Sequence, residues 1–178
     1  MNEFFRGIVA FEEYLGPIFI QVSETFSPKR KEELFDFLKK LPTDLQFFTE
    51  LRHPTWFGNE EISNELFTAL KELNIGAVIT DTAGRRDCAH MHLAMPKTFI
   101  RDVGNSLHAT DFTRIDQWVN RMKYWLDKGI EELYFFMHMH DEATSPELTV
   151  YLVDKMNKEL GLDLIKPKFI TEQKDLFT

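Results

Sequence analysis

The chain has 178 residues, of which 43% are hydrophobic and 28% charged, a composition that excludes disordered, collagen-like and low-complexity proteins. The formal net charge of −8 disfavours nucleic acid and anionic lipid as partners, and we expect neither. A single cysteine, Cys88, cannot form an intramolecular disulfide, which fits a cytoplasmic protein. The apolar runs are too short to span a bilayer, and the N-terminus lacks the apolar stretch of a signal peptide.

Short β-rich runs alternate with helical patterns along the chain. Strands are predicted at residues 18–22, 45–51, 77–80, 98–103 and 133–138. Helices are predicted at residues 27–41, 59–73, 111–128 and 145–160. The segment 82–97 has no clear helical pattern, so we expect an irregular crossover there and an irregular tail after Pro167.

Capping residues mark most of the predicted helix ends. Ser27-Pro28 and Ser145-Pro146 each combine an N-cap residue with a first-turn proline, and Asn59 precedes two glutamates. Gly129 and Gly161 stand where a helix commonly ends in a left-handed residue.

Repeated strand–helix units predict a parallel sheet with right-handed crossovers. Two architectures fit, an open doubly wound sheet and part of a β/α barrel. A doubly wound sheet usually has a glycine-rich loop after its first strand, and residues 22–26 contain no glycine. A TIM-type β/α barrel needs eight strands, whereas about five βα units are predicted here. A barrel would therefore be partial, with its N-terminal strands missing, and its exposed sheet edges would favour self-association.

Polar residues gather at the C-terminal ends of the predicted strands, where both architectures bind ligands. In chain order they are Gln21, Glu50, Arg52, His53, Trp56, Asp81, Thr82, Arg85, Arg101, Asn105, His108, His138, His140, Asp141 and Glu142. Charges inside a parallel sheet are costly unless they are paired. We therefore expect Glu50, Arg52, Asp81 and Arg101 to converge at one end of the sheet as a mutually neutralising cluster.

The functional interpretation of these residues is a pocket for a small anionic or polyhydroxylated ligand. Glu50 or Asp81 would act as the base, and His138 as an acid or hydrogen-bond donor. Arg52 and Arg101 would bind an anionic group. Further residues would contact the substrate: Gln21, His53, Trp56 and Asn105. The structural alternative is that the carboxylates and arginines only neutralise one another.

The histidine pairs invite a metal interpretation. His138 and His140 would point the same way on a strand, but no third ligand is fixed by spacing, so we predict no metal and no other cofactor. His90 and His92 lie in the irregular crossover and fit a solvated loop or a packed histidine. Cys88 has no evident activating partner and is a weak candidate nucleophile.

Five segments carry a resemblance to a known family: residues 15–21, 50–57, 78–85, 101–105 and 133–136. The most specific is Glu-x-Arg-His-x-x-Trp-Phe at 50–57. The chain resembles the YecE-like proteins, or domain of unknown function 72, over the later part of that domain. A histidine common in the family is replaced by Val103, and Gln21 is followed by Val22-Ser23 rather than Leu-Pro.

The resemblance implies a TIM-type barrel whose activity is not established. Residues 1–178 are accordingly predicted to be a single YecE-like domain that is N-terminally incomplete. A hydrolase- or isomerase-like enzyme is the first functional hypothesis. The alternatives are a non-catalytic binding or structural protein, or a truncated remnant of the family, and a metal-dependent enzyme using His138 and His140.

Overall fold

The computed structural model describes residues 2–169. The chain divides into two compact units, Met1–Arg101 with Glu131–Phe135 and Asp102–Ile130 with Phe136–Thr178. The expectation of a single domain over the whole chain stays a prediction.

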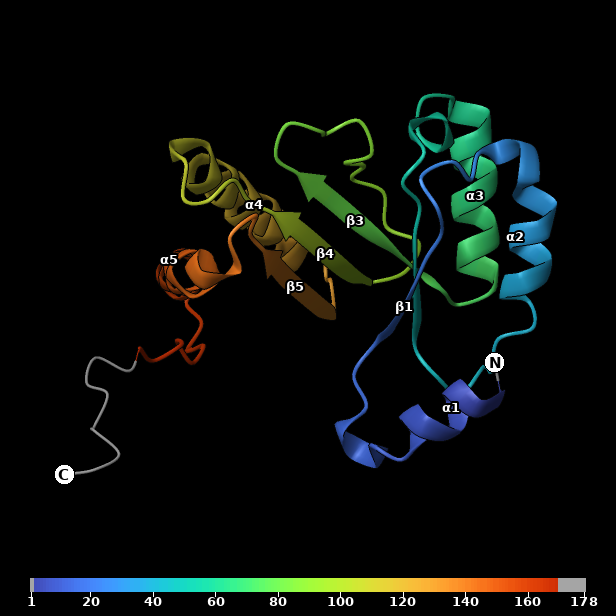
Figure 1. Cartoon of the computed structure of the whole chain (residues 1–178), viewed down its shortest axis with the longest axis horizontal. Coiled ribbons are helices and arrows are strands. Elements are labelled where there is room, and N and C mark those ends of the chain that lie inside the picture. Colours follow the sequence, from blue (N-terminus) through green and yellow to red (C-terminus); the bar gives the residue numbers. More distant parts are fainter. Residues whose placement is uncertain (1, 170–178) are drawn as a thin grey trace. The chain divides into compact units, whose positions relative to one another are not determined.

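Five strands form one parallel sheet in the order β1-β2-β3-β4-β5 (Figure 1). They are β1 (Ile18–Gln21), β2 (Phe47–Glu50), β3 (Gly76–Thr82), β4 (Lys97–Val103) and β5 (Glu132–His138). Each predicted strand is present, with ends that differ by at most two residues. In the register of the first three strands, Phe19 lies beside Phe48 and Phe48 beside Gly76.

The sheet is open in the part of the chain that the structure describes, with β1 and β5 as its edges. The predicted TIM-type barrel is therefore not closed here. Each strand lies beside its neighbour in the sequence, whereas a doubly wound sheet reverses its strand order at a switch point.

The helices are α1 (Asn2–Val9), α2 (Lys31–Leu38), α3 (Glu60–Glu72), α4 (Ala109–Asp127) and α5 (Ser145–Leu160). Helix α1 was not predicted. The Asn59 cap is confirmed, since its Oδ1 accepts a hydrogen bond from Ile62 N at 3.1 Å. Gly129 and Gly161 have φ values of 87° and 66°, which confirms them as left-handed terminating residues.

The two predicted serine–proline helix starts are confirmed in part, since both prolines lie in a first helical turn. Ser27 stands at the N-cap of the short 3-10 helix Pro28–Arg30, which precedes α2, but its side chain makes no capping hydrogen bond. Ser145 is already the first residue of α5, and the residue before it, Thr144, also makes no side-chain cap.

In the first unit, α2 and α3 cover one face of the sheet (Figure 1). Leucines of the two helices bury against strand residues that include Phe47 and Ala77. The other face carries a separate cluster of Phe48, Val78 and Phe99. A Cβ at Gly76 would lie 2.2 Å from Phe48 Cδ1, so glycine is required for the ring to lie there.

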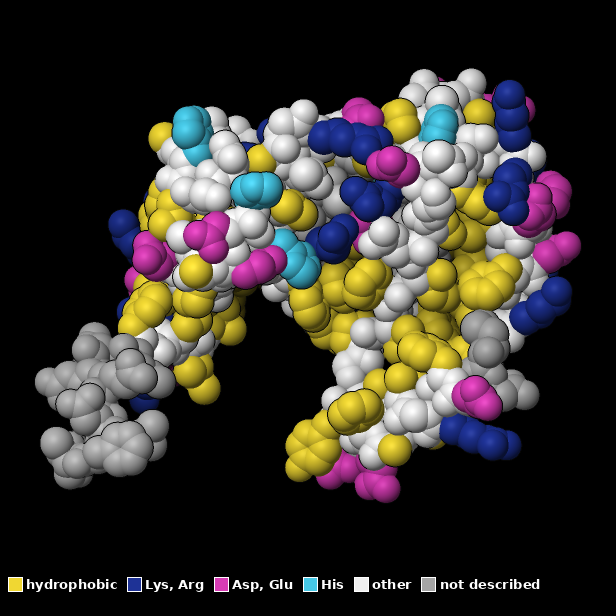
Figure 2. Space-filling view, in the orientation of Figure 1, with side chains coloured by type: hydrophobic (Ala, Val, Ile, Leu, Met, Phe, Trp, Pro, Cys, Tyr) yellow, Lys and Arg dark blue, Asp and Glu magenta, His cyan; other side chains and the backbone are white. Residues whose placement is uncertain are grey.

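The N-terminal part of the first unit leaves large apolar side chains exposed. Phe4 and Val9 of α1 are 53% and 47% exposed, and the turn that follows exposes Phe11 and Tyr14. Figure 2 shows apolar side chains at the surface over α1 and this turn. At the sheet edge that follows, Phe19 of β1 is 42% exposed.

In the second unit, α4 and α5 pack together. The ring of Phe112 meets that of Tyr151 edge-on, with centroids 4.9 Å apart. Asp116 Oδ1 accepts hydrogen bonds from the Tyr151 hydroxyl and pairs with Lys155 Nζ, both at 2.9 Å. These polar contacts fix the two helices along one side.

A buried ion cluster fastens the loop after β4 to α4 in the same unit. Arg114 pairs with Asp102 and, at 3.6 Å, with Asp111, and its Nη1 donates to Val103 O at 3.1 Å. Asp111 accepts hydrogen bonds from Asn105 N at 2.8 and 2.9 Å. All three charged side chains are buried.

Candidate functional site

Glu50 ends β2 and lies at the centre of a polar cluster. Its carboxylate is fully buried, and Oε1 accepts hydrogen bonds from Thr80 Oγ1 at 2.9 Å and Arg101 Nη1 at 2.8 Å. Arg52 Nε lies 3.8 Å from the same oxygen, beyond hydrogen-bond distance. Oε2 is also buried and accepts no hydrogen bond within the described residues.

Strand alternation explains why these side chains meet. Phe48 and Val78 line the face of the sheet opposite α2 and α3, and the residues two positions later are Glu50 and Thr80. Arg101 likewise follows Phe99 by two positions on β4. The apolar side chains of Phe48, Val78 and Phe99 therefore lie next to the polar cluster on the same face of the sheet.

The charges of this Glu50 cluster do not cancel. One carboxylate faces two guanidinium groups, which leaves a local charge of about +1. The side chains of Arg52 and Arg101 are 32% and 21% exposed, whereas Glu50 is fully buried. The arginines therefore face both the buried carboxylate and solvent, and they are the groups that an incoming anion would meet.

Asp81 does not belong to this cluster, which corrects the expectation that it converges with Glu50. It follows Thr80 by one residue, so alternation turns it to the opposite face of the sheet. Its carboxylate pairs with Arg86 Nε at 3.0 Å and accepts a hydrogen bond from Arg86 Nη2. The two buried carboxylates thus occupy the same end but different faces.

Trp56 is also misplaced by the sequence prediction, because it is fully buried. Its indole Nε1 donates to Phe26 O at 2.8 Å, and its ring stacks on that of Phe26 with centroids 6.5 Å apart. It therefore anchors the loop before α2 and has no surface for a substrate. Next to it, His53 Nδ1 accepts a hydrogen bond from Thr55 N and caps the short helix Pro54–Trp56.

The other candidates are distributed over the two units. Gln21 ends β1 in the first unit and is exposed. Asn105 and His138 belong to the second unit. The Asn105 side chain is exposed, while its backbone N–H binds Asp111. The ligand-binding roles of Gln21, His53 and Asn105 stay predictions.

His138 lies in a short hydrogen-bonded chain of the second unit. Its Nδ1 is 3.3 Å from Glu142 Oε1, and Glu142 Oε2 accepts a hydrogen bond from Ser145 Oγ at 2.6 Å. The bond from Ser145, followed by that from His138, lowers the pKa of Glu142. The role of His138 as an acid or hydrogen-bond donor stays a prediction.

A small recess adjoins the Glu50 cluster. The recess is lined by Arg52, Thr80, Thr82, Arg85, Asp87 and Cys88, and its volume is about 10 Å³. The Cys88 thiol donates to Arg52 O at 2.9 Å, and burial raises its pKa, as expected of a poor nucleophile. In its observed conformation the recess has room for about one water.

His90 is a packed histidine, one of the two interpretations of the His90/His92 pair. Its Nε2 lies 3.1 Å from Val78 O, and its ring stacks on Phe57 at 4.5 Å. Burial lowers the pKa of His90 to about 4, so the imidazole is neutral near pH 7.

Among residues 2–169, no group of three histidine, cysteine, aspartate or glutamate side chains could hold a metal ion. No helix of the described chain is long and apolar enough to cross a membrane. The predictions that no cofactor is bound and that the protein is cytoplasmic remain predictions.

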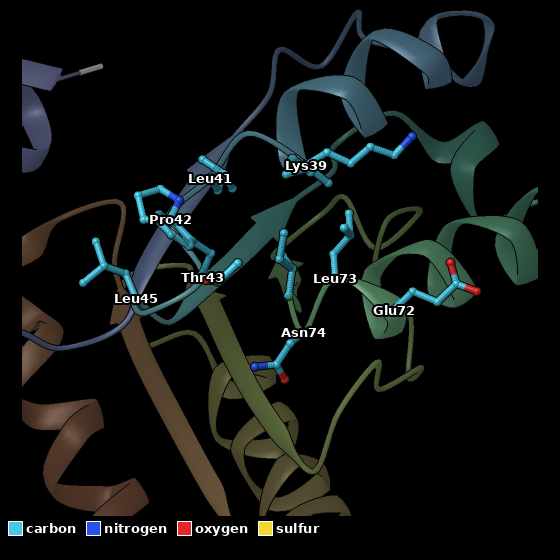
Figure 3. A pocket seen from close by; sticks show the side chains of 11 residues that line it. Lys39, Leu41, Pro42, Thr43, Leu45, Glu72, Leu73 and Asn74 are labelled. Carbon is cyan, nitrogen blue, oxygen red and sulfur yellow. The ribbon is translucent and has the colours of Figure 1, made fainter.

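A larger cavity lies at the other end of the sheet. Its volume is about 310 Å³, and it is bounded by the ends of α2 and α3 and the loop before β2 (Figure 3). Leu41, Leu45 and Leu73 line it, and the charged side chains among its described lining residues are those of Lys39 and Glu72. It lies at the amino ends of the strands, away from the Glu50 cluster.

The family model described as "Protein of unknown function DUF72" matches residues 1–171. The chain belongs to this family. It is 25% identical to the UPF0759 protein YecE of Escherichia coli (strain K12) over 178 residues, and equally to that of strain O157:H7. The match covers 90% of this chain and 65% of YecE, so the chain spans less than two thirds of that relative.

Solved structures of the DUF72 family show the same fold. A protein from Enterococcus faecalis V583 matches with a TM-score of 0.68 and 16% identity, over 95% of this chain and 68% of its own. A protein from Thermotoga maritima MSB8 matches with a TM-score of 0.62 and 19% identity, over 89% and 64%. At this identity the likeness concerns the fold alone.

Two residues of the site were missed by sequence analysis. Thr80 ends the apolar run 77–80, and its position two residues after Val78 could have placed it beside Glu50. Glu24, which pairs with Arg85 Nη1 at 3.0 Å, gave no local indication, because 61 residues separate the partners.

Proposed function

We propose that the Glu50 cluster binds a small anion that also carries hydroxyl groups. The observation that carries the proposal is one buried carboxylate held by two partly exposed arginines, Arg52 and Arg101. A guanidinium presents paired donors that match the two oxygens of a carboxylate or phosphate. The excess positive charge of the cluster supports an anion over a neutral ligand.

The hydroxyl groups follow from the second oxygen of Glu50. Oε2 accepts no hydrogen bond among the described residues, and such a buried oxygen is costly. Arg52 is not hydrogen-bonded to the carboxylate, so a small displacement of its side chain would admit a ligand hydroxyl. A hydroxyl that donates to Oε2 would then position the ligand while the arginines hold its anionic group.

Binding is supported more strongly than catalysis. The recess beside Glu50 has a volume of only about 10 Å³, which does not enclose a substrate in the observed conformation. A hydrolase- or isomerase-like reaction with Glu50 as base is the second candidate. Oε2 favours it, because this oxygen accepts no hydrogen bond from the described residues and a base needs a free lone pair; since Oε2 is buried, Arg52 would first have to move aside.

Calorimetric titration with glycerol 3-phosphate at low ionic strength tests the proposal, with inorganic phosphate and glycerol as partial ligands. We expect glycerol 3-phosphate to bind more tightly than phosphate, and glycerol to bind immeasurably weakly. Arg52→Gln should weaken binding about tenfold, because one charge-assisted contact is lost. Arg30→Gln is the matched control, since Arg30 is an exposed arginine that pairs with Glu33 and lies over the ring of Phe26, outside the Glu50 cluster.

The result that would overturn the proposal is equally specific. Wild-type protein that fails to bind glycerol 3-phosphate, or an Arg52→Gln variant that binds as well as Arg30→Gln, would exclude this site. Circular dichroism of each variant separates loss of binding from loss of folding.

We also propose that the open sheet is part of a β/α barrel and that the protein is cytoplasmic. The first is supported by the consecutive strand order, which lacks the reversal of a doubly wound sheet. The second is supported by the single cysteine, which is unpaired and buried.

A further inference from the structure

Arg85 is held beside the Glu50 cluster by a tight turn at the end of β3. Its backbone N–H donates to Thr82 O at 2.9 Å, and Gly84 within the turn has a φ of 75°, a conformation that favours glycine. From this position Arg85 Nη2 lies 3.4 Å from Arg52 O. The turn therefore places a third arginine next to Arg52 of the proposed site.

The Arg85 guanidinium already binds carboxylates of this chain. Nη1 pairs with Glu24 Oε2 at 3.0 Å, and Nε pairs with Asp87 Oδ1 at 3.3 Å. Glu24 comes from the loop between β1 and α2, so its carboxylate reaches Arg85 from a different segment of the chain. The group is thus oriented to receive an anionic oxygen in addition to that of its neighbour Asp87.

The pair with Glu24 is one that a ligand can replace. The side chains of Arg85 and Glu24 are 45% and 56% exposed, and water and salt screen such a pair strongly. The buried bonds of Glu50 with Thr80 and Arg101 are not open to exchange in this way.

The recess gives a reason for the exchange. Arg52 and Arg85 both line it, together with the hydroxyl-bearing Thr80 and Thr82, yet its volume of about 10 Å³ admits no more than a water. Movement of Arg85 away from Glu24 would enlarge the recess. The guanidinium groups of Arg52 and Arg85 and the hydroxyl of Thr82 would then face the space as donors, next to the carboxylate of Asp87. The two guanidinium groups supply paired donors for an oxyanion.

We infer that Arg85 is a third anion-binding residue of the Glu50 cluster, and that Glu24 occupies its guanidinium until a ligand phosphate takes the carboxylate's place. This inference rests on the proposed function. It assigns the phosphate to the Arg52–Arg85 side of the cluster, and it makes Glu24 an internal competitor that weakens binding.

Titration with inorganic phosphate at pH 7 and low ionic strength tests the inference. Glu24→Gln should bind phosphate about two- to fivefold more tightly than the control Glu65→Gln, the range expected for an exposed ion pair. Glu65 is a suitable control because it is an exposed carboxylate paired with Lys31. Arg85→Gln should weaken binding several-fold, and in the double variant Glu24→Gln should have no further effect.

The outcomes separate this inference from the proposed function. If binding depends on Arg52 but Glu24→Gln and Glu65→Gln have equal affinities, the role of Arg85 and Glu24 is wrong and the site stands. If Arg52→Gln binds as well as Arg30→Gln, the site itself is wrong. Phosphate that binds neither the wild type nor Glu24→Gln overturns the inference, and glycerol 3-phosphate that also fails to bind overturns the proposed function.

Discussion

The two units each contain a cluster of arginine and buried carboxylate side chains. The clusters differ in how far the arginine side chains are exposed to solvent. In the second unit Arg114 is only 7% exposed, and its partners Asp102 and Asp111 are 1% and 0% exposed. In the first unit Glu50 is fully buried, but Arg101 and Arg52 are 21% and 32% exposed. One cluster is closed to solvent and the other opens to it.

This difference separates a structural role from a binding role. The closed cluster binds Val103 O at the end of β4 and Asn105 N in the following loop, and thereby fixes that loop on α4. The open cluster leaves guanidinium groups partly exposed at the surface. Counting ion pairs would not distinguish the two, whereas the exposure of the arginines does.

The largest expected effect tests the closed cluster. Arg114→Met should lower the free energy of unfolding by roughly 3–5 kcal/mol, because two buried carboxylates lose their counter-ion. Urea denaturation measures this, with Arg121→Met on the same helix as the control. We expect Arg52→Gln to cost less than about 1 kcal/mol, as a partly exposed pair should. Equal losses at Arg114 and Arg52 would contradict the comparison.

A smaller effect concerns a buried polar group that is neutral. Burial lowers the pKa of His90 to about 4, below the usual 6.5, so the unfolded chain takes up a proton more readily than the folded one. The contribution of neutral His90 to the free energy of unfolding is therefore fully present above pH 6.5 and is lost as the pH drops towards 4. Between pH 7 and pH 5 the loss should be roughly 2 kcal/mol.

Urea denaturation at both pH values, compared with His90→Gln, isolates this contribution. A glutamine can still donate to Val78 O and does not titrate. Between pH 7 and pH 5 the His90→Gln variant should therefore lose roughly 2 kcal/mol less stability than the wild type. Equal pH dependence in the two proteins would show that His90 is not responsible.

The smallest effect concerns the open edge of the first unit. We propose that the chain self-associates through β1, where Phe19 is 42% exposed on an edge strand. Phe19→Lys should shift the protein towards monomer in size-exclusion chromatography with light scattering. Tyr124→Lys, on an exposed site of α4, should not. A wild-type protein that is monomeric at high concentration would contradict the proposal.

The sequence by itself determined the order and type of the main elements, because their indications are local. Apolar spacing located all five strands and four of the five helices, and Asn59, Gly129 and Gly161 marked helix ends through contacts or conformations within one turn. Helix α1 was missed. The placement of Glu50, Arg52 and Arg101 near one another also followed from the sequence, since parallel strands end at the same edge of a sheet.

Only the tertiary structure decided which strand-end residues share a face and which are buried. Strand β3 is buried on both sides, so its sequence has no alternating pattern that would separate Thr80 from Asp81. The burial of Trp56 depends on Phe26, and the position of Arg85 depends on Glu24, 30 and 61 residues away. Such contacts arise from the packing of distant segments, and a local pattern of residue types carries no information about them.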